Sequence, residues 1–164
     1  RKNMVEMWAY SVCSRQNNYL GTHRGYLIEA PLRRGYVGTG FWEWSTGSAG
    51  INLWQDNHRH SKYSATYRDH LGVLSSLRAE AFREGIEDWK YVIMHDEALV
   101  KAKAAGIEQA LIDAAQAFRD NVPSLLGNAQ RVYQFRDDAR GHLLALHVRL
   151  GDLEAAAVAA VEAD

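Results

Sequence analysis

Apolar and polar residues are distributed differently in the two halves of the chain. Aromatic residues, glycines and β-formers fill the stretch up to about residue 75, whereas Ala, Leu, Glu, Arg and Asp dominate after it. Residues 4 to 13 (MVEMWAYSVC) form a mostly apolar run, which is typical of a strand covered on both faces. Residues 36 to 45 (YVGTGFWEWS) predict a second strand.

A short helix is expected between these strands. Tyr26 to Arg34 is apolar on one side and is followed by Gly35, as at the end of a crossover helix. The order strand, loop, helix, strand predicts one βαβ unit of a parallel sheet. Gly38 and Gly40 would let other backbone approach the second strand closely. Residues 46 to 74 predict a long loop, and a loop of that length is more often functional than accidental.

The second half of the chain has helical periodicity. Ser75 and Ser76 are suitable N-caps for a helix from Leu77 toward Ala105, and Gly106 should end it. Its apolar positions recur at helical spacing: Leu77, Ala81, Phe82, Ile86, Trp89, Val92 and Ile93. Three more helices are expected after it, at residues 107 to 120 ahead of Pro123, residues 129 to 150 ended by Gly151, and residues 153 to 163.

Composition and charge exclude several classes of partner. The chain has 164 residues, of which 47% are hydrophobic and 24% charged, so it can bury a core of its own. Its net charge of -1 produces no electrostatic field that would attract nucleic acid or an anionic membrane surface. No apolar run approaches the roughly 20 residues that span a bilayer. Cys13 is the single cysteine, which excludes an internal disulfide. The cellular compartment stays undetermined, and a secreted or periplasmic parent protein is compatible with the sequence.

Residues 76 to 92 (SLRAEAFREGIEDWKYV) carry a long motif. The motif resembles a signature in the C-terminal part of a bacterial family of β/α-barrel glycosidases, the enzymes related to exo-acting N-acetyl-β-galactosaminidases. Eleven positions match the family pattern: Ser76, Arg78, Glu80, Arg83, Glu84, Gly85, Ile86, Glu87, Asp88, Trp89 and Tyr91. Two weaker matches to the family pattern precede this motif, one at Trp8, Tyr10, Ser11 and Cys13 and one at Gly38, Gly40, Phe41 and Trp44. Arg24 stands where the family carries an arginine, but the family's tryptophan is replaced near Ala30.

The resemblance implies a fold and a division of the chain. The fold class would be α/β, with the last βαβα units of a TIM (β/α)8 barrel followed by an all-helical C-terminal extension. Residues 1–105 would be the C-terminal part of the catalytic domain, and residues 106–164 the extension. The chain opens on Arg1 and not on Met, and a core strand is expected from residue 4 onward. We therefore expect it to be a fragment that starts in the middle of a domain and is mostly helical by residue count.

The same resemblance implies a reaction. Such enzymes use the substrate's acetamido group as nucleophile, oriented by an Asp, while the adjacent Glu protonates the leaving oxygen. The two carboxylates must hold different protonation states near neutral pH, so their environments must differ. In the family this pair stands at the end of an earlier strand. We therefore expect no catalytic residue within this chain, which alone should be inactive.

Four residues are expected to contact a carbohydrate substrate. Trp44 and Glu43 come at the end of the second strand, where a barrel builds its pocket, and flat aromatic faces suit sugar rings. Tyr10 can offer its hydroxyl to a sugar or acetamide oxygen. Arg78 is the arginine of the long helix nearest to the pocket end. Each has a structural alternative, because Trp44 can pack under the helix, Tyr10 can simply pack, and Glu43 can pair with an arginine such as Arg78.

Other candidates are set aside. Asp96 and Glu97 are the chain's adjacent Asp-Glu pair, but they fall on the polar face of a long helix and not at a strand end. Trp8 is expected in the core. His58 and His60 lack a third ligand, so no metal is expected, and no glycine pattern indicates a nucleotide or other cofactor.

Two rival functions remain open. The chain could be a non-catalytic carbohydrate-binding or structural protein, or a helical protein-interaction domain on which the first 75 residues form a cap. A barrel fragment with two parallel strands would leave both sheet edges unpaired, so self-association is also expected. Arg83, Glu84 and Asp88 are expected to belong to a hydrogen-bonded lattice with Arg78 and Glu80 that ties the long helix to the barrel.

Overall fold

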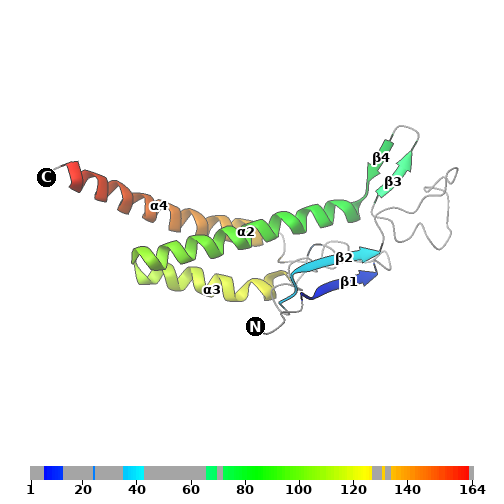
Figure 1. The fold of residues 1–164 in the computed structure, drawn as a ribbon, viewed down its shortest axis with the longest axis horizontal. Helices are drawn as coiled ribbons and strands as arrows, with labels where there is room; N and C mark the ends of the chain where they lie inside the picture. The colour runs from blue at the N-terminus through cyan, green and yellow to red at the C-terminus, as the bar shows by residue number, and fades with distance from the viewer. Residues whose placement is uncertain are drawn as a thin grey trace.

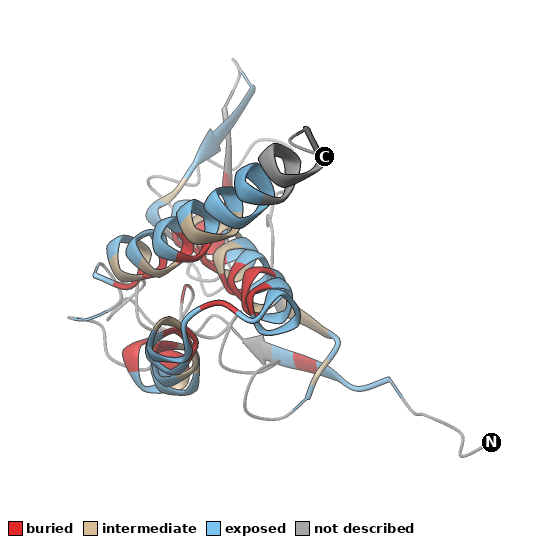
Figure 2. Cartoon of the chain, turned by 90° about the vertical axis from the view of Figure 1, so that its left-hand side faces the viewer, coloured by how far each residue is buried: buried red, intermediate tan, exposed pale blue. Residues whose placement is uncertain are grey.

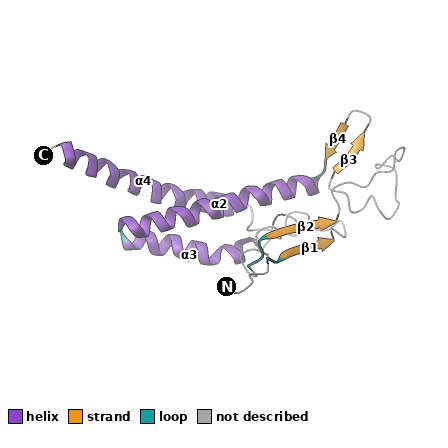
Figure 3. Ribbon diagram, in the orientation of Figure 1, coloured by secondary structure: helices purple, strands orange, loops and turns teal. Residues whose placement is uncertain are grey.

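The computed structural model describes residues 6–12, 24, 35–42, 66–69, 72–126, 131 and 134–162. The described part is mostly helical, with a small parallel pair of strands and a short hairpin (Figure 1). The strand pair lies beside the N-terminal half of the longest helix, and two further helices pack along the rest of it (Figures 1 and 3). A mostly helical chain with a small sheet is thus confirmed.

Strands β1 (Trp8–Val12) and β2 (Gly38–Trp42) pair in parallel. The register places Trp8 opposite Gly38 and Val12 opposite Trp42. Both strands fall inside the predicted ones and have the predicted relative direction, which confirms the parallel arrangement. The crossover helix expected at residues 26 to 34 lies outside the described residues.

A β-hairpin occupies part of the segment that was expected to be a loop. Strands β3 (Thr66–Asp69) and β4 (Gly72–Ser75) pair in antiparallel fashion. Gly72 has a φ of 139°, a backbone conformation that favours glycine. The prediction of a loop through residue 74 was therefore wrong at its end, because strands of four residues are too short to show a clear alternating pattern.

Helix α2 (Leu77–Ala105) has the predicted bounds. The backbone N–H of Ala79 donates to the Ser76 hydroxyl at 3.3 Å, and the Ser75 hydroxyl donates to the Glu80 carboxylate at 2.7 Å. Both predicted serines therefore make hydrogen bonds at the N-terminus of the helix. Gly106 ends it with a φ of 66°, the left-handed conformation expected of a C-terminal glycine.

Helix α3 (Gln109–Leu126) runs through Pro123, which was expected to lie beyond the helix. Proline lacks a backbone N–H and so removes one helical hydrogen bond. The loss falls near the end of the helix, where Val122 and Leu125 on either side of the proline are buried in the core. Packing of these apolar residues stabilises the last turn despite the proline.

Helix α4 (Phe135–Glu162) is a single helix, whereas two were expected, with a break at Gly151. Glycine inside a helix costs about 1 kcal/mol relative to alanine, which is too little to end a helix by itself. Arg149 and Leu150 before Gly151, and Leu153 and Glu154 shortly after it, are good helix formers, so the helix continues through the glycine. The predicted start at residue 129 was also too early.

The core lies between the three helices (Figure 2). One cluster of buried residues joins α2 to α3 and α4, with Val92, Phe118, Val122, Leu125, Phe135 and Ala139 as members. A second joins the same helices nearer the α2–α3 turn, through Ala98, Leu99, Ala102, Ile107, Ile112, Ala115, Leu143 and Leu146. Helices on either side of the expected domain division at residue 105 thus share a core, while the division itself stays a prediction. No described helix has the length and apolar character needed to cross a membrane.

Candidate functional site

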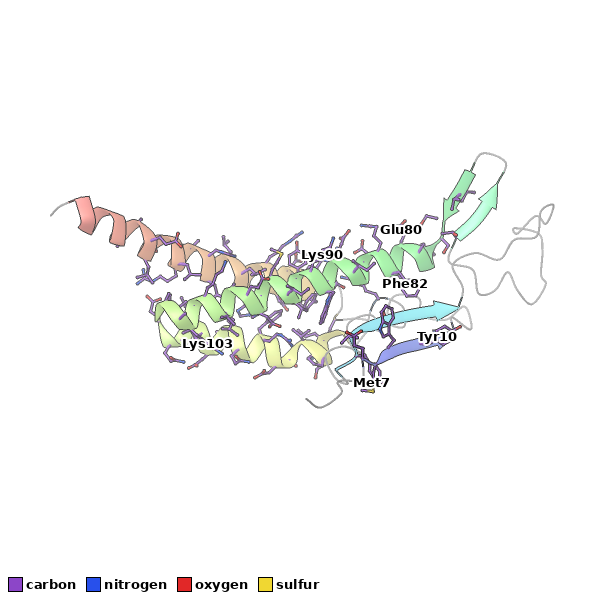
Figure 4. All side chains as sticks on the ribbon, viewed as in Figure 1. Met7, Tyr10, Glu80, Phe82, Lys90 and Lys103 are labelled. Carbon is purple, nitrogen blue, oxygen red and sulfur yellow. The ribbon has the colours of Figure 1, made fainter. Side chains whose placement is uncertain are left out.

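Strand β1 presents two aromatic side chains on its solvent-exposed face. Trp8 is 68% exposed and Tyr10 is 62% exposed, whereas Ala9 between them is buried. Successive side chains of a strand point to opposite faces, so Trp8 and Tyr10 share a face that Ala9 does not. Figure 4 shows Tyr10 on the strand pair, with the side chain of Phe82 on α2 between the helix and the sheet. The pair of aromatic rings therefore forms an open surface on the sheet, which we call the aromatic face.

Glycines of β2 lie beneath this aromatic face. A Cβ atom at Gly38 would come within 2.6 Å of the Trp8 ring, so the indole lies against the bare backbone of β2. A Cβ atom at Gly40 would be 3.8 Å from the Tyr10 ring, an ordinary contact. A close approach of other backbone was expected at both glycines, but the group that approaches Gly38 is the Trp8 side chain. The expectation that Trp8 belongs to the core was wrong, because the ring rests on Gly38 at the surface.

The structure describes the four predicted substrate-binding residues to different extents. Tyr10 lies in β1 on the aromatic face. Arg78 lies in the first turn of α2, and the position of its side chain is outside what the structure describes. Trp44 and Glu43 follow β2 and also lie outside the described residues. Their role in binding a sugar therefore stays a prediction.

A buried carboxylate joins α2 to two other parts of the chain. Asp88 is 0% exposed and accepts a hydrogen bond of 2.9 Å from Nη2 of Arg24, whose Nε also pairs with it. Nε of Arg136, on α4, donates to the same carboxylate at 2.6 Å. Two guanidinium groups thus compensate the desolvation of one buried anion, as a buried charge requires.

Arg136 makes further contacts that fix its position. Its Nη2 donates to the backbone carbonyl of Glu84 at 2.8 Å, and its Nη1 pairs with the Glu84 carboxylate at 2.8 Å and with Glu87 at 3.2 Å. Burial acts to lower the pKa of Arg136, but the hydrogen bond to Asp88 and the negative charges of Asp88, Glu84 and Glu87 together raise it above its usual value. The guanidinium therefore remains charged in this setting, and α4 is held against α2 through it.

The predicted lattice on α2 is present in part. Arg83 pairs with Glu80 at 2.8 Å, with Glu84 at 2.7 Å and with Glu87 on an exposed face. Asp88 does not join Arg83, because it faces inward toward Arg24 and Arg136. The helical spacing was sufficient to predict the surface pairs. The partner from α4 was missed, since nothing in the sequence around Arg136 distinguishes it from the other arginines.

Asp96 and Glu97 lie within α2 and not at the end of a strand. Asp96 accepts a hydrogen bond of 2.9 Å from Nη2 of Arg119 on α3, and Glu97 is exposed. The pair therefore lies on a helix surface, as expected, although Asp96 is held by an arginine and is not simply solvated. Among the described residues no group of three or more His, Cys, Asp or Glu side chains could hold a metal ion. His58 and His60 lie outside the described part.

Comparison with protein-family models, with curated proteins and with solved structures found no match for this chain. The candidate site is therefore defined by its own geometry, which consists of an exposed aromatic face on a parallel strand pair beside a long helix. A buried ion-pair cluster of Arg24, Asp88 and Arg136 lies on the inner side of that helix.

Proposed function

We propose that this chain is the C-terminal portion of a β/α-barrel glycoside hydrolase that acts on N-acetylated or related β-linked sugars. Its part in the reaction is to supply a wall of the sugar pocket. The catalytic Asp-Glu pair is supplied from outside residues 1–164. Carbohydrate is the proposed substrate, and the described helices give no reason to add a membrane partner.

The exposed aromatic face carries this proposal. In a β/α barrel, one face of each strand packs against the surrounding helices and the other points to the barrel interior. Ala9 is buried, while Trp8 and Tyr10 on the opposite face are exposed. That asymmetry fits two strands taken from a barrel, because in the whole enzyme the remaining strands would enclose the interior-facing side and leave only its carboxyl end open to the pocket.

Aromatic side chains also suit the substrate class. The faces of indole and phenol rings pack on the apolar faces of sugar rings, and the Tyr10 hydroxyl can donate to or accept from a sugar or acetamide oxygen. In a barrel, side chains near the carboxyl ends of the strands line the pocket. Trp44 and Glu43 follow the end of β2, and Arg78 starts the next helix, so we assign these residues to the same wall.

Sugar binding to the aromatic face can be measured on this chain directly. We expect saturation-transfer NMR to show contact between the protein and N-acetylgalactosamine or N-acetylglucosamine, with the weak affinity of an incomplete pocket. Tyr10→Ala should reduce the transfer, whereas Phe82→Leu, a change of a buried residue on α2, should preserve it. Equal transfer in all three proteins would argue against this face as the sugar-binding surface.

A non-catalytic carbohydrate-binding protein is the second candidate, and the same exposed aromatic face favours it. The two candidates agree on sugar binding and differ on turnover. Hydrolysis of a chromogenic N-acetyl-β-hexosaminide by the product of the whole gene supports the glycosidase. Sugar binding without hydrolysis of any glycoside supports the binding protein.

A further inference from the structure

His95 lies where α2, α3 and α4 meet. Its side chain is 0% exposed, and neither ring nitrogen has a hydrogen-bond partner among the described residues. The ring centroid is 5.1 Å from that of Phe118 on α3 and 6.1 Å from that of His142 on α4. Phe118 and His142 are themselves 4.7 Å apart, so one residue from each helix contributes to this aromatic junction.

The charged groups around His95 do not favour a positive charge there. Asp96 follows His95 in the chain, and its carboxylate is held by Arg119 of α3. His142 is the titratable group that faces His95 from α4. Burial lowers the pKa of His95, His142 and Arg119 lower it further, and Asp96 acts in the opposite direction. The packed arrangement therefore requires a neutral imidazole.

We propose that His95 makes the three-helix packing acid-sensitive, and that its protonation releases α3 and α4 from α2. An imidazolium carries two N–H donors, and the junction offers neither of them an acceptor among the described residues. Leaving these donors unsatisfied in an apolar site is costly, so the proton is accommodated by opening the junction to water. The inference concerns the helices alone and does not depend on the proposed sugar chemistry.

The direction of the pH effect follows from the lowered pKa. An unfolded chain has an ordinary histidine with a pKa of about 6.5 and takes up a proton there, while folded His95 resists protonation. The stabilisation from neutral His95 is complete above about pH 6.5 and is lost progressively as the pH falls below that value. Acidification thus weakens the junction.

Urea unfolding of the whole chain between pH 7.5 and 5.5 tests the proposal. The wild type should take up additional protons on unfolding, up to about one per molecule from His95. His95→Gln should lose that uptake, and the exposed His147→Gln, also a histidine change, should retain it. A His95→Gln protein with the full proton uptake of the wild type would overturn the proposal.

A second measurement covers the case in which His95→Gln does not fold. NMR titration of the wild-type imidazole protons should show one histidine that titrates below about pH 6.5. Amide hydrogen exchange in α3 and α4 should rise together with that titration. Titration of His95 at an ordinary value, or unchanged exchange in both helices, would contradict acid-driven release.

Discussion

Arg136 of α4 donates a 2.6 Å hydrogen bond to the fully buried carboxylate of Asp88 on α2. The same carboxylate also binds Arg24, which precedes β2 in the chain. Asp88 thus links a residue of the strand-containing half to the helical half through a single buried group. Arg136 thus ties α4 to α2, and Arg24 is held to the same carboxylate.

Removing the negative charge of Asp88 should destabilise the chain strongly. Asp88→Asn removes the anion that the buried Arg24 and the half-buried Arg136 share, and loss of one partner from a buried ion pair costs about 3–5 kcal/mol. The free energy of unfolding from urea titration measures this loss.

Glu80→Gln is the matched control for Asp88→Asn, because it also neutralises one acid on α2. Glu80 pairs with Arg83 at the surface, and exposed ion pairs contribute little to stability. We expect a much smaller loss for Glu80→Gln. Equal losses in the two variants would show that the buried cluster has no special importance.

Gly85 should not tolerate a large side chain. It is buried within α2, and the sequence places it beside Phe82 and Trp89 on the inner face. Gly85→Leu should therefore overpack this face and cost about 1–3 kcal/mol in unfolding free energy.

The control for Gly85 is Gly141, an exposed glycine of α4 with nothing within 4 Å of a Cβ atom built on it. Gly141→Leu should raise the thermal midpoint, because leucine has a helix propensity better than that of glycine by roughly 1 kcal/mol or slightly less. A rise for Gly85→Leu as well would remove the evidence for close packing there.

Gly38 should be needed to keep Trp8 flat on the sheet. Gly38→Ala places a Cβ atom 2.6 Å from the indole and must displace it, whereas Gly40→Ala makes an ordinary contact with Tyr10. We expect a changed Trp8 indole resonance and weaker sugar contact for Gly38→Ala. Both should be nearly unchanged for Gly40→Ala, and identical behaviour of the two variants would contradict the arrangement.

Self-association is expected from the strand pair. Within the described part, β1 and β2 pair only with each other, so each has a second edge with unpaired backbone groups, next to the exposed Trp8 and Tyr10. Static light scattering of the purified chain should give a mass above that of a monomer. A clean monomer at high concentration would count against the truncated-barrel account.

The sequence was most informative where local signals and packing agree. Ser76 and Gly106 mark both ends of α2 correctly, because capping chemistry is local and depends on few residues. The strands β1 and β2 were also predicted, since their apolar runs are long enough to show. Pro123 and Gly151 were misleading, because tertiary packing and good neighbouring helix formers outweighed their local preferences.

The site was predictable only in part. Tyr10 could be singled out as an aromatic residue near the end of a strand, but the exposure of Trp8 depends on which elements cover the sheet, and that is not a local property. The junction at His95 was missed as well. Its signal would have been a histidine on the buried stripe of α2, between Val92 and Leu99, and such a position does not reveal which side chains of α3 and α4 face it.

Hydrolysis of a panel of chromogenic β-glycosides tests the proposed glycosidase most directly. The panel is assayed with the product of the whole gene and with residues 1–164 alone. We expect the gene product to hydrolyse N-acetyl-β-hexosaminides and Tyr10→Ala to reduce that activity. Residues 1–164 alone should show no turnover. Turnover by residues 1–164 alone would contradict the expectation that the catalytic carboxylates lie elsewhere. Absence of glycoside hydrolysis by the gene product across the panel would contradict the glycosidase itself.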